Sequence, residues 1–312
     1  MKNWFNVIGW LLSVLTATGI GFVILLIAKT RRLHSSANWF ILSLAAADFG
    51  VGIAVYPSGY FCHNSIMASC NTRVYMAFFW FFLHSSVSNI CTLTWDRYVA
   101  IVHPFKYNTS MTKRRPGVVI LIAWLIPFVI SLSLFVGMYV TNSKTAWKVL
   151  RSLGVTAFDM VSCVVLFCAV VRILGAARAK SHQVCETQLQ LQCNFSSPEA
   201  VTSRRPRTPN TARFIIAVVV FFLGCYVIVN FSVFCQTFSC PVSAEKVGQV
   251  VTCLLVLNSA INPMAYALLK RDIKREISLF ISHMSNSSRS VRRPYLKPTI
   301  MEQIGQREGQ VS

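Results

Sequence analysis

The stretch LNSAINPMAY, which runs from Leu257 to Tyr266, places two asparagines, a serine and a proline inside an otherwise apolar segment. Much earlier in the chain, Asp96, Arg97 and Tyr98 end another apolar segment. Charged residues at membrane depth are costly, and for this reason they usually mark function. The two stretches therefore indicate a membrane protein in which polar side chains between the helices carry the activity.

The composition supports a membrane protein. The 312 residues are 54% hydrophobic and only 13% charged, about half the charged fraction of an ordinary soluble domain. A membrane-spanning helix needs roughly 20 mostly apolar residues, and no stretch alternates with the period of a barrel strand. Seven stretches are long enough to span: 5–28, 38–61, 73–102, 116–140, 149–177, 211–235 and 246–269. The sequence predicts an all-α membrane protein, a seven-transmembrane helix bundle over residues 5–269.

The net charge of +20 could indicate a nucleic-acid partner, but the distribution of the charge argues against one. With seven spans, the basic clusters near Arg31, Arg114 and Arg205 and those after Lys270 all fall on one side of the membrane. Cytoplasmic loops carry such an excess, and anionic lipid attracts it. We expect residues 1–4 outside the cell, the C-terminus in the cytosol, membrane lipid as a partner and no nucleic acid.

The segments outside the spans differ in pattern. Residues 181–210 and 282–312 are polar and predict a flexible cytosolic loop and a disordered cytoplasmic tail. Between them, residues 270–281 place Ile273, Ile277 and Phe280 on one helical face, with basic residues on the other. This pattern predicts a short amphipathic eighth helix at the membrane surface.

Asp48 lies near the middle of the second span, where a carboxylate must find partners, take up a proton or bind a cation. Its candidate partners are Ser86, Asn258, Ser259 and Asn262. These oxygen-bearing side chains suit a hard cation such as sodium. They equally suit a cluster of hydrogen bonds that holds helices together. From the residues alone, both interpretations stay open.

Four cysteines lie at or beyond the predicted outer ends of the spans, where oxidation is feasible: Cys62, Cys70, Cys235 and Cys240. The pair Cys235–Cys240 falls in one short loop between the last two spans, and we favour it as a disulfide. Cys62–Cys70 is the second candidate, since geometry cannot be read from sequence.

Four motifs occur in the order and spacing of one known family. They are Asp48 in SLAAAD, the Asp96-Arg97-Tyr98 triplet, Trp124 in IAWLIP, and NSAINPMAY. Over residues 10–280 the chain resembles the rhodopsin-like (class A) G-protein-coupled receptors. The resemblance implies a plasma-membrane receptor that couples an extracellular small molecule or peptide to a heterotrimeric G protein.

The resemblance also implies roles for single residues. The family's aspartate, helix-three serine and helix-seven asparagines form a sodium-linked network, which maps to Asp48 and its four candidate partners. The family's arginine meets the G protein, and its NPxxY tyrosine swings toward that arginine; these roles map to Arg97 and Tyr266. Pro263 removes a helical hydrogen bond and leaves a place to bend.

The chain departs from the family pattern in several places. Ile20 stands where the family has an asparagine, and the helix-six pattern FxxCWxP runs from Phe222, with Tyr226 for tryptophan and Ile228 for proline. We keep Phe222 and Tyr226 as activation candidates. The second outer loop is short and lacks cysteine, and helix five lacks proline. With a cysteine pair in the third outer loop, these features resemble melanocortin receptors and their wider relatives, including adenosine receptors.

The ligand is the least determined feature. Amine receptors of the family use a helix-three aspartate, and the matching position is Phe79; the span 247–269 has no lysine for a retinal Schiff base. We therefore expect neither a typical biogenic amine nor retinal. Phe79, Phe82 and Tyr226 are candidate pocket residues, although aromatic runs also serve packing. Asp159 is the acid best placed to hold a cationic group.

Two other classes of function put polar residues in membranes. A transporter or channel is the main alternative, but we find no inverted repeat and no pair of interrupted spans. A membrane enzyme is the other, and no HExxH or GxSxG motif occurs. His84 stands essentially alone within the spans, and we expect it to be a satisfied core residue.

Overall fold

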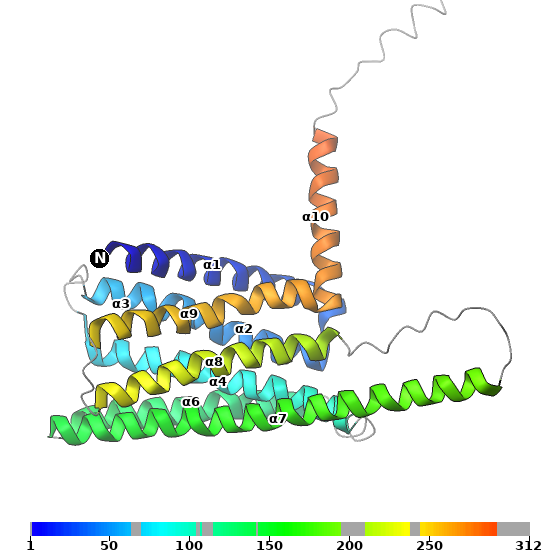
Figure 1. Cartoon of the computed structure of the whole chain (residues 1–312). Helices are drawn as coiled ribbons and strands as arrows, with labels where there is room; N and C mark the ends of the chain where they lie inside the picture. The colour runs from blue at the N-terminus through cyan, green and yellow to red at the C-terminus, as the bar shows by residue number, and fades with distance from the viewer. Residues whose placement is uncertain are drawn as a thin grey trace, which may run out of the picture.

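The computed structural model describes residues 2–63, 70–103, 107, 115–141, 143–194, 210–237 and 244–291. Every regular element in this part of the chain is a helix. Seven of the helical segments are long and apolar enough to cross a membrane, which confirms the predicted fold class. They lie side by side in one bundle, as Figure 1 shows. The elements are α1 (Lys2–Lys29), η1 (Arg31–Leu33), α2 (Ser36–Ala54), α3 (Tyr56–His63), α4 (Thr72–Val102), α6 (Arg115–Val140), α7 (Lys144–Asn194), α8 (Asn210–Thr237), α9 (Ala244–Leu269) and α10 (Arg271–Val291).

The helix α4 is the centre of the bundle, because it contacts α2, α6, α7 and α8. The most buried span is the one formed by α2 and α3, where 67% of the most apolar window is buried against 22% for α6. Exposed apolar side chains cover the outward faces of α1, α6 and α7, as expected of helices that face lipid. The polar side chains of α2 and α4 therefore lie where they can meet only other helices.

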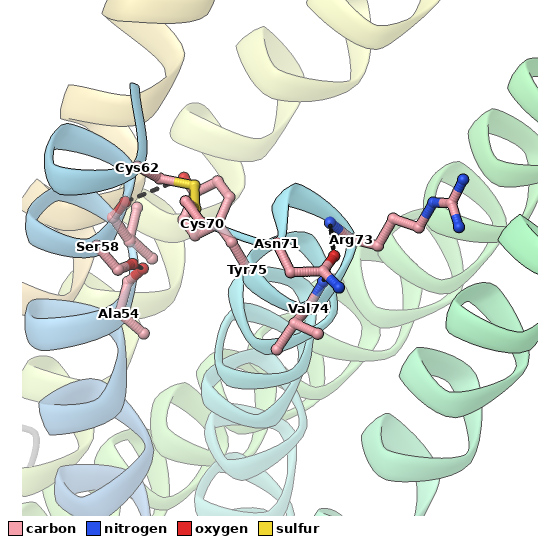
Figure 2. Close-up of a disulfide and its surroundings, with 9 residues drawn as sticks. Ala54, Ser58, Cys62, Cys70, Asn71, Arg73, Val74 and Tyr75 are labelled. Atoms are coloured by element: carbon pink, nitrogen blue, oxygen red, sulfur yellow. Dashed lines mark hydrogen bonds between the residues drawn. A yellow bond between two sulfur atoms is a disulfide. The ribbon is translucent and has the colours of Figure 1, made fainter. Parts of the chain in front are cut away.

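The second span consists of two helices, because α2 ends at Ala54 and α3 begins at Tyr56. Pro57 follows that break, at the start of a helix where its missing N–H costs nothing. At the end of α3, Cys62 forms a disulfide with Cys70, with a Cα–Cα distance of 5.3 Å (Figure 2). The prediction of a Cys62–Cys70 disulfide, the second candidate from the sequence, is thus confirmed. Cys240 lies outside the described residues, so a Cys235–Cys240 bond stays a prediction.

Two predicted flexible segments are partly helical. The helix α7 runs on to Asn194, inside the segment 181–210 that we predicted to be a loop, and α10 runs on to Val291, inside the predicted tail. Neither helical extension contains a proline or glycine, and glutamine, glutamate and leucine in the first favour helix. The prediction of disorder rested on polarity, which does not separate a solvated helix from a coil. As Figure 1 shows, α10 turns away from the bundle where α9 ends.

Candidate functional site

Asp48 joins three helices through its carboxylate. Its Oδ1 accepts hydrogen bonds from the hydroxyls of Ser86 (2.6 Å) and Ser259 (2.8 Å), and its Oδ2 accepts one from Nδ2 of Asn262 (2.6 Å). The side chain is 0% exposed. These hydrogen bonds join four of the five residues that were predicted from the sequence to form one polar cluster. Asn258 is buried one turn before Asn262, but no hydrogen bond joins it to Asp48 in the described part of the chain.

The oxygen donors around Asp48 fit a hard cation. The carboxylate carries the charge, and the hydroxyl oxygens of Ser86 and Ser259 keep lone pairs that can turn toward an ion. Sodium has the same preference for oxygen ligands as other hard cations. The same contacts also suffice to hold the helices without an ion, so the geometry is compatible with both interpretations of the sequence.

The packing of α1 against α9 explains the isoleucine in the family's asparagine position. Ile20 is 1% exposed and belongs to the apolar core. At the adjacent Gly19, an added Cβ would lie 3.3 Å from Cγ of Pro263, so the two helices meet closely at the proline. Pro263 lies inside α9, as predicted, with its asparagine neighbour bound to Asp48. Helix α1 therefore supports this site by packing alone.

A second buried polar group extends the site toward α6. Ser43 donates to Oδ1 of Asn89 (2.6 Å) and accepts from Nε1 of Trp124 (2.9 Å). Trp124 was predicted only as part of a family motif, without a hydrogen-bond partner. The signal was present, since a buried indole N–H normally finds an acceptor.

Asp96 and Arg97 pair at the far end of α4. Nη2 of Arg97 lies 3.2 Å from Oδ2 of Asp96, whose side chain is fully buried. The hydroxyl of Tyr107 donates to Oδ1 of Asp96 (3.2 Å). Burial raises the pKa of Tyr107, and the adjacent charge of Asp96 is the second cause. Tyr98 points elsewhere, with its ring 5.4 Å from Trp95 and 5.9 Å from His103.

Lys270 is a second cation at this end, which the sequence analysis counted only as part of a basic cluster. It is 7% exposed and donates to Oδ1 of Asn38 on α2, while Asn38 donates to the carbonyl of Leu33 (2.7 Å). Burial is the main cause that lowers the pKa of Lys270 to about 8, followed by the charge of Arg97. Its place directly after an apolar span was the available signal.

Phe222 and Tyr226 form a buried aromatic pair in α8. Their rings stack with centroids 4.1 Å apart and an interplanar angle of 22°. They are 0% and 3% exposed, so both belong to the bundle core. Tyr266 lies within α9, but its side chain is outside what the structure describes. Its predicted movement toward Arg97 stays a prediction.

Asp159 on α7 is the other buried acid near mid-bundle. It is 2% exposed, and its Oδ1 has no hydrogen-bond partner among the described residues. It lies within electrostatic reach of Tyr226. In the neighbouring residue Phe158, the ring lies 4.7 Å from that of His84 on α4. The buried carboxyl group therefore lies among the helices that α7 contacts, chiefly α4 and α8.

Three further polar groups around this region lack partners in the described part of the chain. Both ring nitrogens of His84, Nε1 of Trp80 and Oδ1 of Asn230 make no hydrogen bond. Trp80 stacks on His84 at 5.5 Å, and Asn230 donates only to the carbonyl of Tyr226. The expectation that His84 is a satisfied core residue was wrong. Its ring lies against those of Trp80 and Phe158, neither of which offers an acceptor to the imidazole.

The two predicted phenylalanine candidates diverge. Phe79 is half-buried against Tyr75 and Trp80. The ring of Phe82 instead fills the space that a side chain at Gly50 would need, so it packs against α2. Phe79 and Phe82 therefore have different surroundings, and in the described part of the chain no ring contact joins either of them to Tyr226.

Comparison with known proteins agrees with this geometry. The model of the 7 transmembrane receptor (rhodopsin family) matches residues 19–266. The chain is 26% identical over 298 residues to trace amine-associated receptor 8a of Rattus norvegicus, with 86% of this chain and 83% of the relative covered. It is 25% identical to trace amine-associated receptor 6 of Homo sapiens (88% and 85% covered) and 24% identical to octopamine receptor beta-2R of Chilo suppressalis (85% and 76% covered).

The chain therefore belongs to the rhodopsin family of seven-transmembrane receptors and is a G-protein-coupled receptor, neither an enzyme nor a transporter. The narrower resemblance to melanocortin and adenosine receptors is not supported, because these relatives are trace amine and octopamine receptors.

Proposed function

We propose that this receptor responds to an extracellular small molecule with a basic nitrogen, which the carboxylate of Asp159 binds. The observation that carries the proposal is a buried carboxylate whose Oδ1 has no hydrogen-bond partner among the residues that the structure describes. A buried charge without a partner is costly, and a bound cation offsets that cost. The printed names of the relatives, trace amine and octopamine receptors, support an amine as the ligand class.

The amine would lie differently from one held by α4. Phe79, at the position on α4 (the third membrane span) where amine receptors have their aspartate, carries no charge. Asp159 instead comes from α7. Phe79, Trp80 and Tyr226 supply aromatic faces nearby, and such faces attract cations. The unpaired nitrogens of His84 and the N–H of Trp80 add hydrogen-bonding capacity for a polar group elsewhere on the ligand.

The test is a panel of amines, each paired with an uncharged isostere, read by G-protein dissociation in cells that express the receptor. Wild type should respond to an amine and not to its isostere. Asp159→Asn keeps the shape, removes the charge and should lose that response. An amine response that survives Asp159→Asn unchanged would falsify the role of Asp159.

The second part of the proposal is the direction of signalling. Arg97 with Asp96 forms the surface that engages a heterotrimeric G protein, and the protein spans the plasma membrane with its N-terminus outside. The excess of basic residues on the Arg97 side supports this orientation. Arg97→Ala should abolish nucleotide exchange on the G protein at normal surface expression, and an epitope at the N-terminus should stain intact cells.

The third part is that Asp48, Ser86 and Ser259 hold a sodium ion that favours the inactive arrangement. Support comes from one buried carboxylate and two hydroxyls drawn from α2, α4 and α9. An ion shifts the balance between two states only by its different affinity for each. Sodium, compared with an impermeant organic cation at equal ionic strength, should therefore reduce basal activity and raise the melting temperature of the purified receptor.

A further inference from the structure

A groove on the outside of the bundle lies between α4 and α6, and one of its lining rings, Phe81, lies 5.9 Å from the ring of Trp124. It encloses about 300 Å³. Val74, Ala77, Phe78 and Phe81 line it from α4, and Phe128, Ser131, Leu132 and Phe135 line it from α6. Ser131 is the one polar residue in this set, and its buried hydroxyl has no hydrogen-bond partner in the described part of the chain.

The groove opens toward lipid and not toward the bundle interior. Phe78, Phe128 and Leu132 are each about half exposed, at 54%, 52% and 48%. His84 and Ser86, further along α4, are by contrast buried. From Val74 to Phe81 the helical rise is about 10 Å along the helix axis. The groove is therefore elongated in the direction in which an acyl chain lies in a bilayer.

A cation stands at one end of this groove. The guanidinium carbon of Arg73 lies 4.6 Å from the centre of the Tyr139 ring, so the pair bridges α4 and α6. The ring of Tyr139 in turn lies 5.2 Å from that of Phe135, which lines the groove. Figure 2 shows Arg73 extended from the first turn of α4 toward the neighbouring helices, away from the disulfide. Arg73 is thus connected to the groove through aromatic contacts.

The position of Arg73 suits a phosphate. It lies in the first turn of α4, where the helix dipole is positive and the side chain of Asn71 accepts from the backbone N–H groups of Arg73 (3.1 Å) and Val74 (3.4 Å). Within the described residues, no carboxylate forms a salt bridge with this guanidinium. Arginine binds phosphate through paired hydrogen bonds, and it keeps this capacity while it stacks on an aromatic ring.

We propose that this groove binds a phospholipid of the surrounding membrane, with one acyl chain between α4 and α6 and the phosphate on Arg73. The charge at the end of an apolar, membrane-facing groove selects an amphiphile with an anionic head over an uncharged lipid. The acyl chain gains little by leaving other chains, because lipid tails are as apolar as the groove. The preference therefore comes mainly from the phosphate. This site does not depend on the proposed amine ligand.

Native mass spectrometry of the purified receptor in detergent tests the proposal. The probes are a phosphatidic acid and the diacylglycerol with the same two chains, which lacks only the phosphate. Wild type should bind the phosphatidic acid about tenfold more tightly than the diacylglycerol, which is the difference expected for one charge-assisted hydrogen-bonded contact. Arg73→Gln should remove the preference, whereas Arg31→Gln, which removes an arginine at the opposite end of the bundle, should leave this preference intact.

A second pair of variants tests the groove itself. Leu132→Trp fills it from its exposed side and should displace the lipid, while Leu121→Trp, on the lipid-facing surface of the same helix, should not. A phosphatidic acid with a photoreactive acyl chain should label the wild-type peptide that contains residues 128–135. Melting temperatures of all four variants confirm that they fold. If a tryptophan variant does not fold, the result for Arg73→Gln alone suffices to test the proposal.

Several outcomes would overturn the proposal. Equal binding of diacylglycerol would show that the phosphate is not recognised, and unchanged preference in Arg73→Gln would place it elsewhere. Retention of the photolabel in Leu132→Trp would exclude the groove. A receptor dimer that Leu132→Trp dissociates, with lipid binding unaltered, would assign the groove to a second copy of the chain.

Discussion

Two buried aspartates in this receptor differ in how fully their carboxylates are hydrogen-bonded. Asp48 accepts three hydrogen bonds from α4 and α9, whereas Asp159 has an oxygen with no partner in the described part of the chain. Both are nearly inaccessible, at 0% and 2% exposure. The carboxylate of Asp48 is satisfied by the fold itself, so it couples helices. The carboxylate of Asp159 has an oxygen that is available to a ligand, and for this reason we assign the binding of the ligand to Asp159.

The largest expected effect concerns the ligand. Asp159→Asn should weaken the potency of an active amine by about a hundredfold, because one member of a buried charge pair is lost. Asp48→Asn should change it much less, since Asp48 belongs to the helix contacts. Concentration–response curves for G-protein dissociation measure both. Equal losses in the two variants would mean that the aspartates do not differ in the way proposed.

The next effect concerns stability, and the order of the two residues reverses. Asp48→Ala leaves Ser86, Ser259 and Asn262 without an acceptor, which costs on the order of 3 kcal/mol or more. Asp159→Ala removes a group that already lacks a partner, so we expect a change within about 1 kcal/mol. Thermal unfolding of the ligand-free receptor in detergent gives the comparison. A larger fall in melting temperature for Asp159→Ala would contradict it.

The sequence predicted the satisfied aspartate better than the unsatisfied one. Asp48 and its partners belong to motifs with fixed spacing, and helical geometry turns Ser259 and Asn262 toward the same side. Asp159 could be flagged as an isolated acid, but the missing partners of His84, Trp80 and Asn230 depend on how three helices pack. Such absences have no sequence pattern, because any nearby hydroxyl or carbonyl would have removed them.

The end of the bundle that carries Arg97 shows the same limit. Asp96 and Arg97 were predicted from their motif. Tyr107, which follows α4 and donates back to Asp96, was missed, and so was Lys270, whose partner Asn38 comes from a distant part of the chain. Cysteine pairing was ranked by loop position and favoured Cys235–Cys240. The structure forms Cys62–Cys70, since the end of α3 brings its Cα within 5.3 Å of Cys70. Distances between helix ends decide these contacts.

Sodium should stabilise the receptor through Asp48 and not through Asp159. At a concentration ten times its dissociation constant, a ligand of the folded state adds about 1.4 kcal/mol. We expect a rise in melting temperature in sodium relative to an organic cation for wild type and Asp159→Asn, and none for Asp48→Asn. The same three proteins should show the same pattern in basal nucleotide exchange. If all three respond alike, Asp48 serves only to hold the helices.

The smallest effect comes from Lys270. This buried cation is only partly satisfied by hydrogen bonds, so in this respect it is intermediate between Asp48 and Asp159. Its single hydrogen bond is to Asn38, and burial, with Arg97 as the second cause, lowers its pKa to about 8. The folded state thus releases this proton more readily than the unfolded state does. Below pH 8 the lysine is charged in both states and the cost of burying it is fully present. As the pH rises from about 8 toward the lysine's ordinary value near 10.4, that cost declines, because only the unfolded state stays protonated. The stability of wild type should therefore rise between pH 8 and 10, by at most about 1.4 kcal/mol per pH unit, relative to Lys270→Met. Lys274→Met, which changes an exposed lysine one turn further on, should keep the wild-type slope. The measurement is the melting temperature of the three proteins across this pH range, and parallel curves for wild type and Lys270→Met would show that the burial of this charge does not affect folding.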